Sequence, residues 1–374
     1  MRLPIRLAAL LACLAAFAPA TQAASPRLLE IREGDHICLL GNTLAERLQH
    51  FNGWETLLHQ RFPAHRLVVR NLAWPADEVV LRPRAEGFGD PDQHLTFSKA
   101  DVILAFFGFN ESFAGPAGLP AFERDLDAWL TATLKANYSG KGSPRVALVS
   151  PIAHENLRNP HLPDGAANKR SLEIYTAAMR AVAEKHGVAF ADVYQPTRQL
   201  FAAGPGPFTI NGVHLNAAGD AAFAPLLDRA LFGPNGASSP ANEGLRAAIA
   251  DKNFHWYNRY RIVDSFYVYG GRSGLKFADG PQTNRDGMER EREVLDLMTA
   301  NRDRRVWTLA QDGAARGPVD DSNVPAFLPV VTSFGVNLKS QPGANPGMTT
   351  KTAPANYADL LPAADTLKCF KLAP

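Results

Sequence analysis

The sequence has few cysteines, no excess of charge of either sign and no apolar run long enough to cross a membrane. It contains 3 cysteines in 374 residues. They form neither a disulfide framework nor a Cys-x-x-Cys metal pattern. The 39 Lys and Arg residues nearly balance the 37 Asp and Glu residues, and no basic stripe stands out. Nucleic acid is therefore not an expected partner.

The first 24 residues have the pattern of a secretory signal. Arg2 and Arg6 precede an apolar run over residues 7–18, and small residues follow it. That run is shorter than the roughly 20 residues of a transmembrane helix. The sequence thus predicts an exported chain, periplasmic or extracellular, cleaved after residue 23 or 24. No membrane span is expected in the mature chain. Cys13 also permits a lipoprotein interpretation, which the residues before it fit poorly.

Short apolar runs alternate with segments whose apolar residues recur every three or four positions. Near-continuous apolar runs are typical of parallel strands that helices cover on both faces. Residues 25–235 are therefore expected to form a three-layer α/β domain. The expected strands are 36–41, 65–73, 100–108, 144–152 and 188–194, and the expected helices are 44–62, 119–137 and 169–186.

The composition changes near residues 232–244, where Gly, Pro, Ser and Asn gather. Residues 236–310 are expected to be a mixed, helical and aromatic-rich extension, and residues 311–374 a low-order tail. The rings and arginines of "HWYNRYR" (255–261) permit two interpretations: packing on the α/β domain, or contact with a sugar or an acidic ligand. A further interpretation makes residues 250–307 a docking surface for a partner protein.

Four short motifs stand where a parallel α/β sheet binds its ligands, beyond the carboxyl ends of the strands. They are "GNTL" (41–44), "NLAWPADEV" (71–79), "GFNES" (108–112) and "NGVHLNAAGD" (211–220). Their order resembles the four blocks of the SGNH, or GDSL-type, hydrolases, over about residues 30–235. The resemblance implies a flavodoxin-like sheet, a small-molecule or glycan ester as substrate, and hydrolysis by a Ser-His-Asp triad without metal or organic cofactor.

The resemblance assigns a catalytic role to three residues, two of which depart from the family pattern. Thr43 stands at the serine nucleophile, His214 matches the base, and Asn211 stands at the triad aspartate. Gly41 matches the family's glycine, and Asn42 replaces its usual aspartate. A threonine hydroxyl can attack an ester once a base removes its proton. An asparagine orients the histidine without supplying charge, and this exchange in a triad can lower kcat by about 10⁴.

The same resemblance implies donors for the oxyanion of the reaction intermediate. Ala76 stands at the oxyanion glycine, and Asn110 matches the block asparagine. The change to Ala76 is mild, because the donor there is a backbone N–H. Its methyl group matters only where the turn needs a positive φ or a close approach of substrate. Two functions remain open on this evidence: an ester hydrolase, or a weakened or inactive relative that binds an ester-bearing or acidic glycan.

Local sequence offers other roles for some of these positions. Thr43 and Glu46 fit a capping box, in which the threonine hydroxyl caps the helix and the glutamate reaches back. Ser112 and Ser150 follow strands and are alternative nucleophiles. Residues 154–155, a His-Glu pair, either line the rim of a pocket or belong to an exposed polar loop.

Overall fold

The computed structural model describes most of the chain between residues 27 and 328. The described residues are 27–82, 89–235, 242–261, 270–275, 282–314, 317–326, 328, 331–332 and 351–352. The expected signal peptide (1–24) and most of the expected tail (311–374) lie outside them.

Five parallel strands form one sheet. They are β1 (His36–Gly41), β2 (Val68–Asn71), β3 (Val102–Phe106), β4 (Arg145–Val149) and β5 (Ala189–Ala191), in the order β2-β1-β3-β4-β5. Each lies within an expected strand, and the order is that of flavodoxin-like folds. The expected three-layer α/β fold is confirmed.

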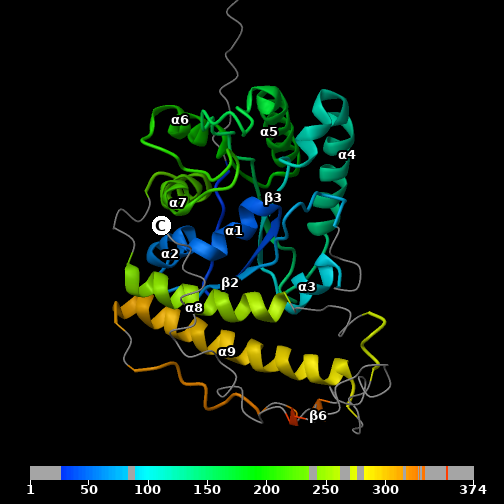
Figure 1. Ribbon diagram of the computed structural model, residues 1–374, viewed down its shortest axis with the longest axis vertical. Coiled ribbons are helices and arrows are strands. Elements are labelled where there is room, and N and C mark those ends of the chain that lie inside the picture. The colour runs from blue at the N-terminus through cyan, green and yellow to red at the C-terminus, as the bar shows by residue number, and fades with distance from the viewer. Residues whose placement is uncertain are drawn as a thin grey trace, which may run out of the picture.

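Alternate residues of each strand point to opposite faces of the sheet, and helices bury both faces (Figure 1). In β1, Ile37 and Leu39 join the cluster under the first helix layer, and Cys38 and Leu40 join the opposite cluster. The first layer is α1 (Thr43–Phe51), α2 (Gly53–Arg61) and α7 (Ala217–Phe232); the second is α3 (Pro91–Phe97), α4 (Gly115–Thr133) and α5 (Ala166–His186). The short elements η1 (Glu111–Ala114) and α6 (Tyr194–Ala203) complete the domain.

The expected helix over 44–62 is wrong in one respect, because it is two helices. Asn52 separates them in the left-handed region, with φ +66°. Gly53 follows, and a Cβ there would lie 2.4 Å from Asp220 Oδ2 on α7. Asn-Gly is a turn signal, and the apolar periodicity across it concealed the break.

Two long helices follow the α/β domain and lie side by side along the β2 edge of the sheet (Figure 1). They are α8 (Glu243–Tyr260) and α9 (Asn284–Asp312). In the "HWYNRYR" segment, His255, Trp256, Arg259 and Tyr260 are buried. These four residues therefore pack within the fold, and the interpretation that they contact a sugar is wrong. Two-residue strands, β6 (Val331–Thr332) and β7 (Lys351–Thr352), pair antiparallel beyond α9.

Among the described residues, no helix combines the length and apolar character that a membrane span requires.

A buried carboxylate joins α7 to α2. Asp220 lies in the first turn of α7, and its Oδ2 accepts a hydrogen bond from Gly53 N at 3.2 Å. Its other oxygen has no hydrogen-bond partner within the described part of the chain. Burial raises the pKa of Asp220 to about 7. This contact fixes the start of α7, six residues after His214, against the helices that follow β1.

We expect Asp220→Asn to stabilise the protein at pH 8. The folded state keeps a proton on Asp220 that the unfolded state releases above about pH 4, so stability falls as pH rises toward 7. The variant has no carboxyl group to lose that proton, so its free energy of unfolding at pH 8 should exceed that of the wild type by roughly 1–3 kcal/mol. Urea unfolding measures the difference. Little gain is expected at pH 4.

Asp228→Asn, on the same helix, is the matched control. Asp228 forms a two-bond ion pair with Arg61, with contacts of 3.0 and 2.6 Å. The same substitution should there destabilise the protein at pH 8, because it leaves a buried arginine without its partner charge. Equal effects of the two variants would contradict the role given to Asp220.

Candidate active site

The site begins where β1 passes very close to β3. Gly41 has φ +114°, and a Cβ there would lie 2.0 Å from Phe106 O. Asn42 N then donates to the same carbonyl at 3.1 Å. Only glycine fits both the conformation and the contact. The close approach makes α1 begin directly at the carboxyl edge of the sheet.

Asn42, and not Thr43, caps α1. Its buried side chain accepts a hydrogen bond from Leu44 N at 3.1 Å. The expected capping box of Thr43 and Glu46 is therefore wrong: Glu46 Oε1 instead lies 2.9 Å from His50 Nε2. Asn is among the best N-cap residues, and it takes the cap one position earlier. Thr43 becomes the first residue of the helix, half-buried.

His214 is oriented by Asn211. Asn211 Oδ1 accepts a hydrogen bond from His214 N at 3.1 Å and lies 2.9 Å from His214 Nδ1. Since that oxygen is an acceptor for the backbone N–H, it also accepts from the ring, and Nδ1 carries the proton. The lone pair is then on Nε2, which makes no hydrogen bond to any described residue. Nε2 is thus available as a base.

The loop before α7 places His214 beside α1. Arg47 Nη2 donates to Leu215 O at 2.8 Å, and Thr43 lies one turn before Arg47. Burial lowers the pKa of His214, the Arg47 charge lowers it further, and the Glu46 carboxylate opposes both. The ring is therefore neutral at neutral pH. Within the described residues, no hydrogen bond joins the Thr43 hydroxyl to His214.

His154 and Glu155 contact the loop that precedes α7 and carries His214. Glu155 is buried and accepts from Phe208 N at 2.9 Å and from Thr209 N at 2.7 Å. A Cβ on Gly212, where φ is +94°, would lie 2.3 Å from His154 Nε2. The expectation of a pocket rim or an exposed loop is wrong for Glu155. Its partners are backbone amides more than 50 residues further along the chain, which no local sequence pattern indicates.

Ala76 lies in an exposed turn after β2 in the left-handed region, with φ +67°. This conformation favours glycine. The Ala76 N–H makes no hydrogen bond within the described residues, and the same holds for Thr43 N–H at the start of α1. Both are therefore free donors at the carboxyl edge of the sheet.

Asn110 and Glu111 tie the loops after β2 and β3 together. Asn110 Nδ2 donates to Asp77 O at 3.2 Å. Glu111 Oε1 accepts from Val79 N at 3.0 Å, and its Oε2 accepts from Gly108 N at 2.9 Å. Burial raises the pKa of Glu111, and these N–H groups oppose the rise. Asn110 thus lies in the loop after β3, with one of its two side-chain amide hydrogens already bonded to Asp77 O. Glu111 supports the same loops, and its role was not predicted from the sequence.

The alternative nucleophiles are buried structural groups. Ser112 Oγ donates to Phe109 O at 2.6 Å. Ser150 Oγ accepts from Val193 N at 2.9 Å and from Tyr194 N at 3.0 Å. Neither side chain is exposed to solvent, so neither hydroxyl can reach a substrate. The described part of the chain also holds no cluster of three or more His, Cys, Asp or Glu residues suited to a metal ion.

The four motifs thus meet at one edge of the sheet, as in the hydrolases they resemble. A family model described as the GDSL-like Lipase/Acylhydrolase family matches residues 38–222. This segment belongs to that family.

Solved structures with a similar fold come from several bacteria. A putative GDSL-like lipase from Parabacteroides merdae is 16% identical with a TM-score of 0.44, over 55% of this chain and 99% of that one. An acetyl-xylooligosaccharide esterase from Geobacillus stearothermophilus is 17% identical with a TM-score of 0.43, over 54% and 96%. A gut microbial diltiazem-metabolizing enzyme is 16% identical with a TM-score of 0.43, over 55% of this chain and 48% of that one, so this chain matches about half its length. These likenesses are too distant to carry a substrate over. A comparison with curated proteins finds no match.

In this GDSL-like domain, we expect Ala76→Gly to stabilise the fold by about 0.5–1 kcal/mol. Glycine relieves about 1–2 kcal/mol of left-handed strain and gives back part of that gain in chain entropy. Thermal or urea unfolding measures the change. Ala128→Gly, at an exposed position in the middle of α4, is the control and should cost about 1 kcal/mol. A loss of stability in both variants would contradict the strain at Ala76.

Proposed function

We propose that this chain is an exported ester hydrolase that acts on acyl esters, with acetyl or other acyl esters of glycans as the substrate class. The observation that supports it best is the 2.9 Å contact between His214 Nδ1 and Asn211 Oδ1, which leaves Nε2 free beside the helix that Thr43 begins. Export rests on the signal-like pattern of residues 1–24.

In the proposed mechanism, His214 Nε2 removes the hydroxyl proton of Thr43 as its Oγ1 bonds to the ester carbonyl carbon. The resulting oxyanion accepts from the N–H groups of Thr43 and Ala76 and from the Asn110 amide. The intermediate collapses, the C–O bond to the alcohol breaks, and His214 returns the proton to the leaving oxygen. Water, deprotonated by His214, then releases the acid from acyl-Thr43 by the reverse steps.

Asn211 supplies orientation but no charge. In a Ser-His-Asp triad the carboxylate also stabilises the imidazolium that forms during attack. Here the ring gains that charge in a half-buried position, with Arg47 nearby. The proposed enzyme is consequently slow relative to one with a complete triad.

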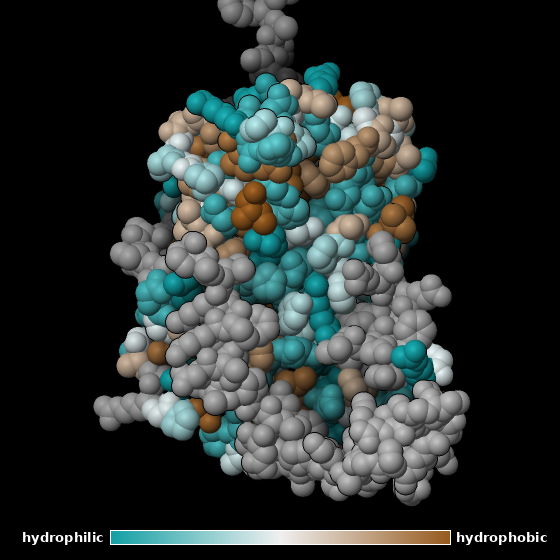
Figure 2. Space-filling view, in the orientation of Figure 1, coloured by the Kyte–Doolittle hydropathy of each residue, from teal (hydrophilic) through white to brown (hydrophobic). Residues whose placement is uncertain are grey.

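Two exposed apolar side chains that are close in sequence to site residues support an acyl ester as substrate. Phe113 is 70% exposed and lies three residues after Asn110, and Ile210 is 59% exposed and directly precedes Asn211. On the face in Figure 2, hydrophilic and apolar residues are intermixed over the part of the chain that is coloured. Exposed apolar side chains next in sequence to the motif residues suit the acyl group of an ester substrate.

Two features support a second function, the binding of such a glycan without turnover. The Thr43 hydroxyl makes no hydrogen bond to His214 among the described residues, and Asn211 is uncharged. Both features weaken the proton transfer that hydrolysis needs.

Hydrolysis of p-nitrophenyl acetate and release of acetate from acetylated xylan separate the two functions. We expect turnover by the wild type, and a loss of about 10²–10⁴ in kcat for Thr43→Ala and for His214→Ala. Thr43→Ser keeps the hydroxyl and is the matched control, so it should be at least as active as the wild type. Equal background rates for all four proteins would reject hydrolysis of these esters. Activity lost only with His214→Ala would move the nucleophile away from Thr43.

The pH dependence of kcat/KM should show His214 as the base. Because the pKa of His214 is lowered, activity should rise with pH through a midpoint below 6.5 and stay level from pH 7 to 8. Asn211→Asp places a carboxylate at Nδ1, which favours the imidazolium. We therefore expect it to move the midpoint upward and to raise kcat at pH 8 by about tenfold or more. An unchanged midpoint would contradict the contact between the two side chains.

A further inference from the structure

The two C-terminal helices bind the free edge of the sheet through side-chain donors. Strand β2 is an edge strand, so the carbonyls of every second residue point away from β1. Two such carbonyls in β2, and those of Leu67 and Ala73 that continue the same alternation on either side of it, each accept from a side chain of α8, of the residue after it, or of α9. Trp307 Nε1 donates to Leu67 O at 2.8 Å, Lys252 Nζ to Val69 O at 3.2 Å, Trp256 Nε1 to Asn71 O at 2.8 Å, and Arg261 Nη2 to Ala73 O at 2.6 Å.

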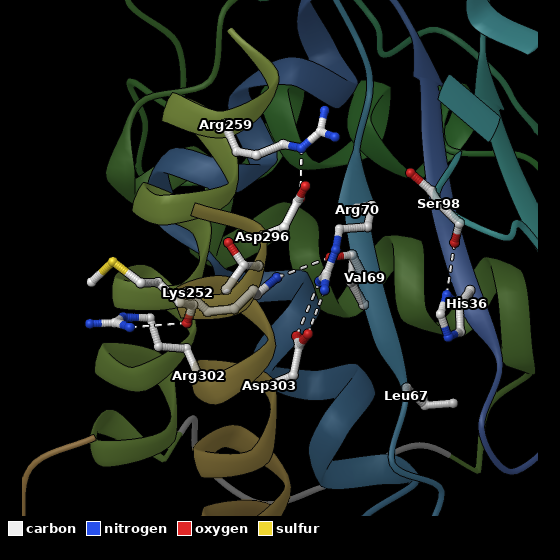
Figure 3. A network of polar contacts seen from close by, with 12 residues as sticks. His36, Leu67, Val69, Arg70, Ser98, Lys252, Arg259, Asp296, Arg302 and Asp303 are labelled. Atoms are coloured by element: carbon white, nitrogen blue, oxygen red, sulfur yellow. Dashed lines mark hydrogen bonds and ion pairs between the residues drawn. The ribbon is translucent and has the colours of Figure 1, made fainter. Parts of the chain in front are cut away.

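The middle of this interface is a buried charge network. Lys252 is almost fully buried, with Glu55 Oε1 at 2.6 Å and Asn253 Oδ1 at 2.7 Å. Arg70 pairs with Asp303 of α9 beside it, as Figure 3 shows between β2 and the two helices. Loss of one partner of such a pair leaves an uncompensated charge buried in the interface, which is strongly destabilising.

The last contacts of this series reach the active site. The Ala76 loop (residues 72–77) follows β2, and Tyr260 Oη donates to Leu72 O at 2.9 Å and accepts from Trp74 Nε1 at 3.1 Å. The Arg261 guanidinium lies over the Trp74 ring, 3.8 Å from its centroid, while it donates to Ala73 O. Tyr260 and Arg261, at the end of α8, thus hold the loop that carries the proposed oxyanion donor.

Arg261 also meets α1. Its Nη2 lies 3.6 Å from Glu46 Oε1, and this carboxylate is one turn after Thr43. The charged groups that act on His214 are Arg47 and Glu46, both on α1; its own loop contributes the uncharged Asn211. The nearer partner of Glu46 Oε1 is His50 Nε2 at 2.9 Å, and the Arg261 guanidinium adds a permanent positive charge beside the same carboxylate.

We propose that Arg261 is a positioning residue of the active site, which holds the Ala76 loop and Glu46 in place around His214. The C-terminal helices thereby contribute to the rate of hydrolysis. This inference rests on the ester hydrolysis proposed above.

Arg261→Gln tests this, with Trp307→Phe as the matched control at the other end of β2. Both variants lose one bond to an edge carbonyl, and both are expected to melt earlier than the wild type. Arg261→Gln alone should lower kcat for p-nitrophenyl acetate by about tenfold with KM nearly unchanged. It should also move the acid midpoint of kcat/KM upward, because Glu46 loses a neighbouring cation. Arg261→Lys should return the midpoint toward that of the wild type.

Hydrogen exchange separates failure of this inference from failure of the proposed function. The amides of Trp74 and Asp77 are hydrogen-bonded, to Gly41 O at 3.0 Å and to Trp74 O at 3.3 Å. With or without turnover, Arg261→Gln should speed their exchange, and Trp307→Phe should not. Equal exchange in both variants, or an unchanged kcat and midpoint in Arg261→Gln of an active enzyme, would overturn the inference.

Discussion

The site depends on the close approach of β1 and β3 at Gly41. A side chain there would collide with Phe106 O at 2.0 Å, so the strands can end together only with glycine. That shared end places the start of α1, the Ala76 loop and the turn after β3 within hydrogen-bond reach of one another. Trp74 N donates to Gly41 O at 3.0 Å, and Asn110 Nδ2 donates to Asp77 O at 3.2 Å. Three of the four motifs are therefore brought together by the backbone spacing of a parallel sheet.

The fourth motif needs side chains to hold it there. His214 lies outside the sheet, and its loop is fixed by Arg47 from α1, by the buried Glu155, and by Asp220 against Gly53. The geometry of a base is thus retained without the usual carboxylate at Nδ1. Burial keeps the ring neutral and ready to accept a proton. Asn211 Oδ1 also accepts from His214 N, so this side chain holds the loop as well as the ring, and in the proposed reaction it offers no charge to a protonated His214.

Much of the fold could be predicted from sequence because parallel strands are buried on both faces and appear as apolar runs. All five strands were found this way, and the motifs then fell at the correct edge. The prediction failed where one residue decides between similar local structures. Asn42 took the cap expected of Thr43, and Asn52 broke a helix whose apolar period continues across it. Glu111 and Glu155 could not be distinguished from exposed acids, because their partners include backbone amides distant in sequence, Val79 N for Glu111 and Thr209 N for Glu155.

The helices α8 and α9 show the same limit more clearly. A helix that covers the face of a sheet needs an apolar stripe, which sequence reveals. A helix that covers an edge must instead offer donors to alternate carbonyls, and α8 does so with Lys252 and Trp256 among its buried residues. The sequence of such a helix mixes polar and apolar residues without a single apolar stripe. Nothing in it distinguishes a buried lysine from an exposed one. The family match ends at residue 222, yet four outward carbonyls along the edge strand of the matched domain and its flanks accept hydrogen bonds from side chains of residues 252–307. The unit that folds around the site is therefore larger than the unit that sequence similarity outlines.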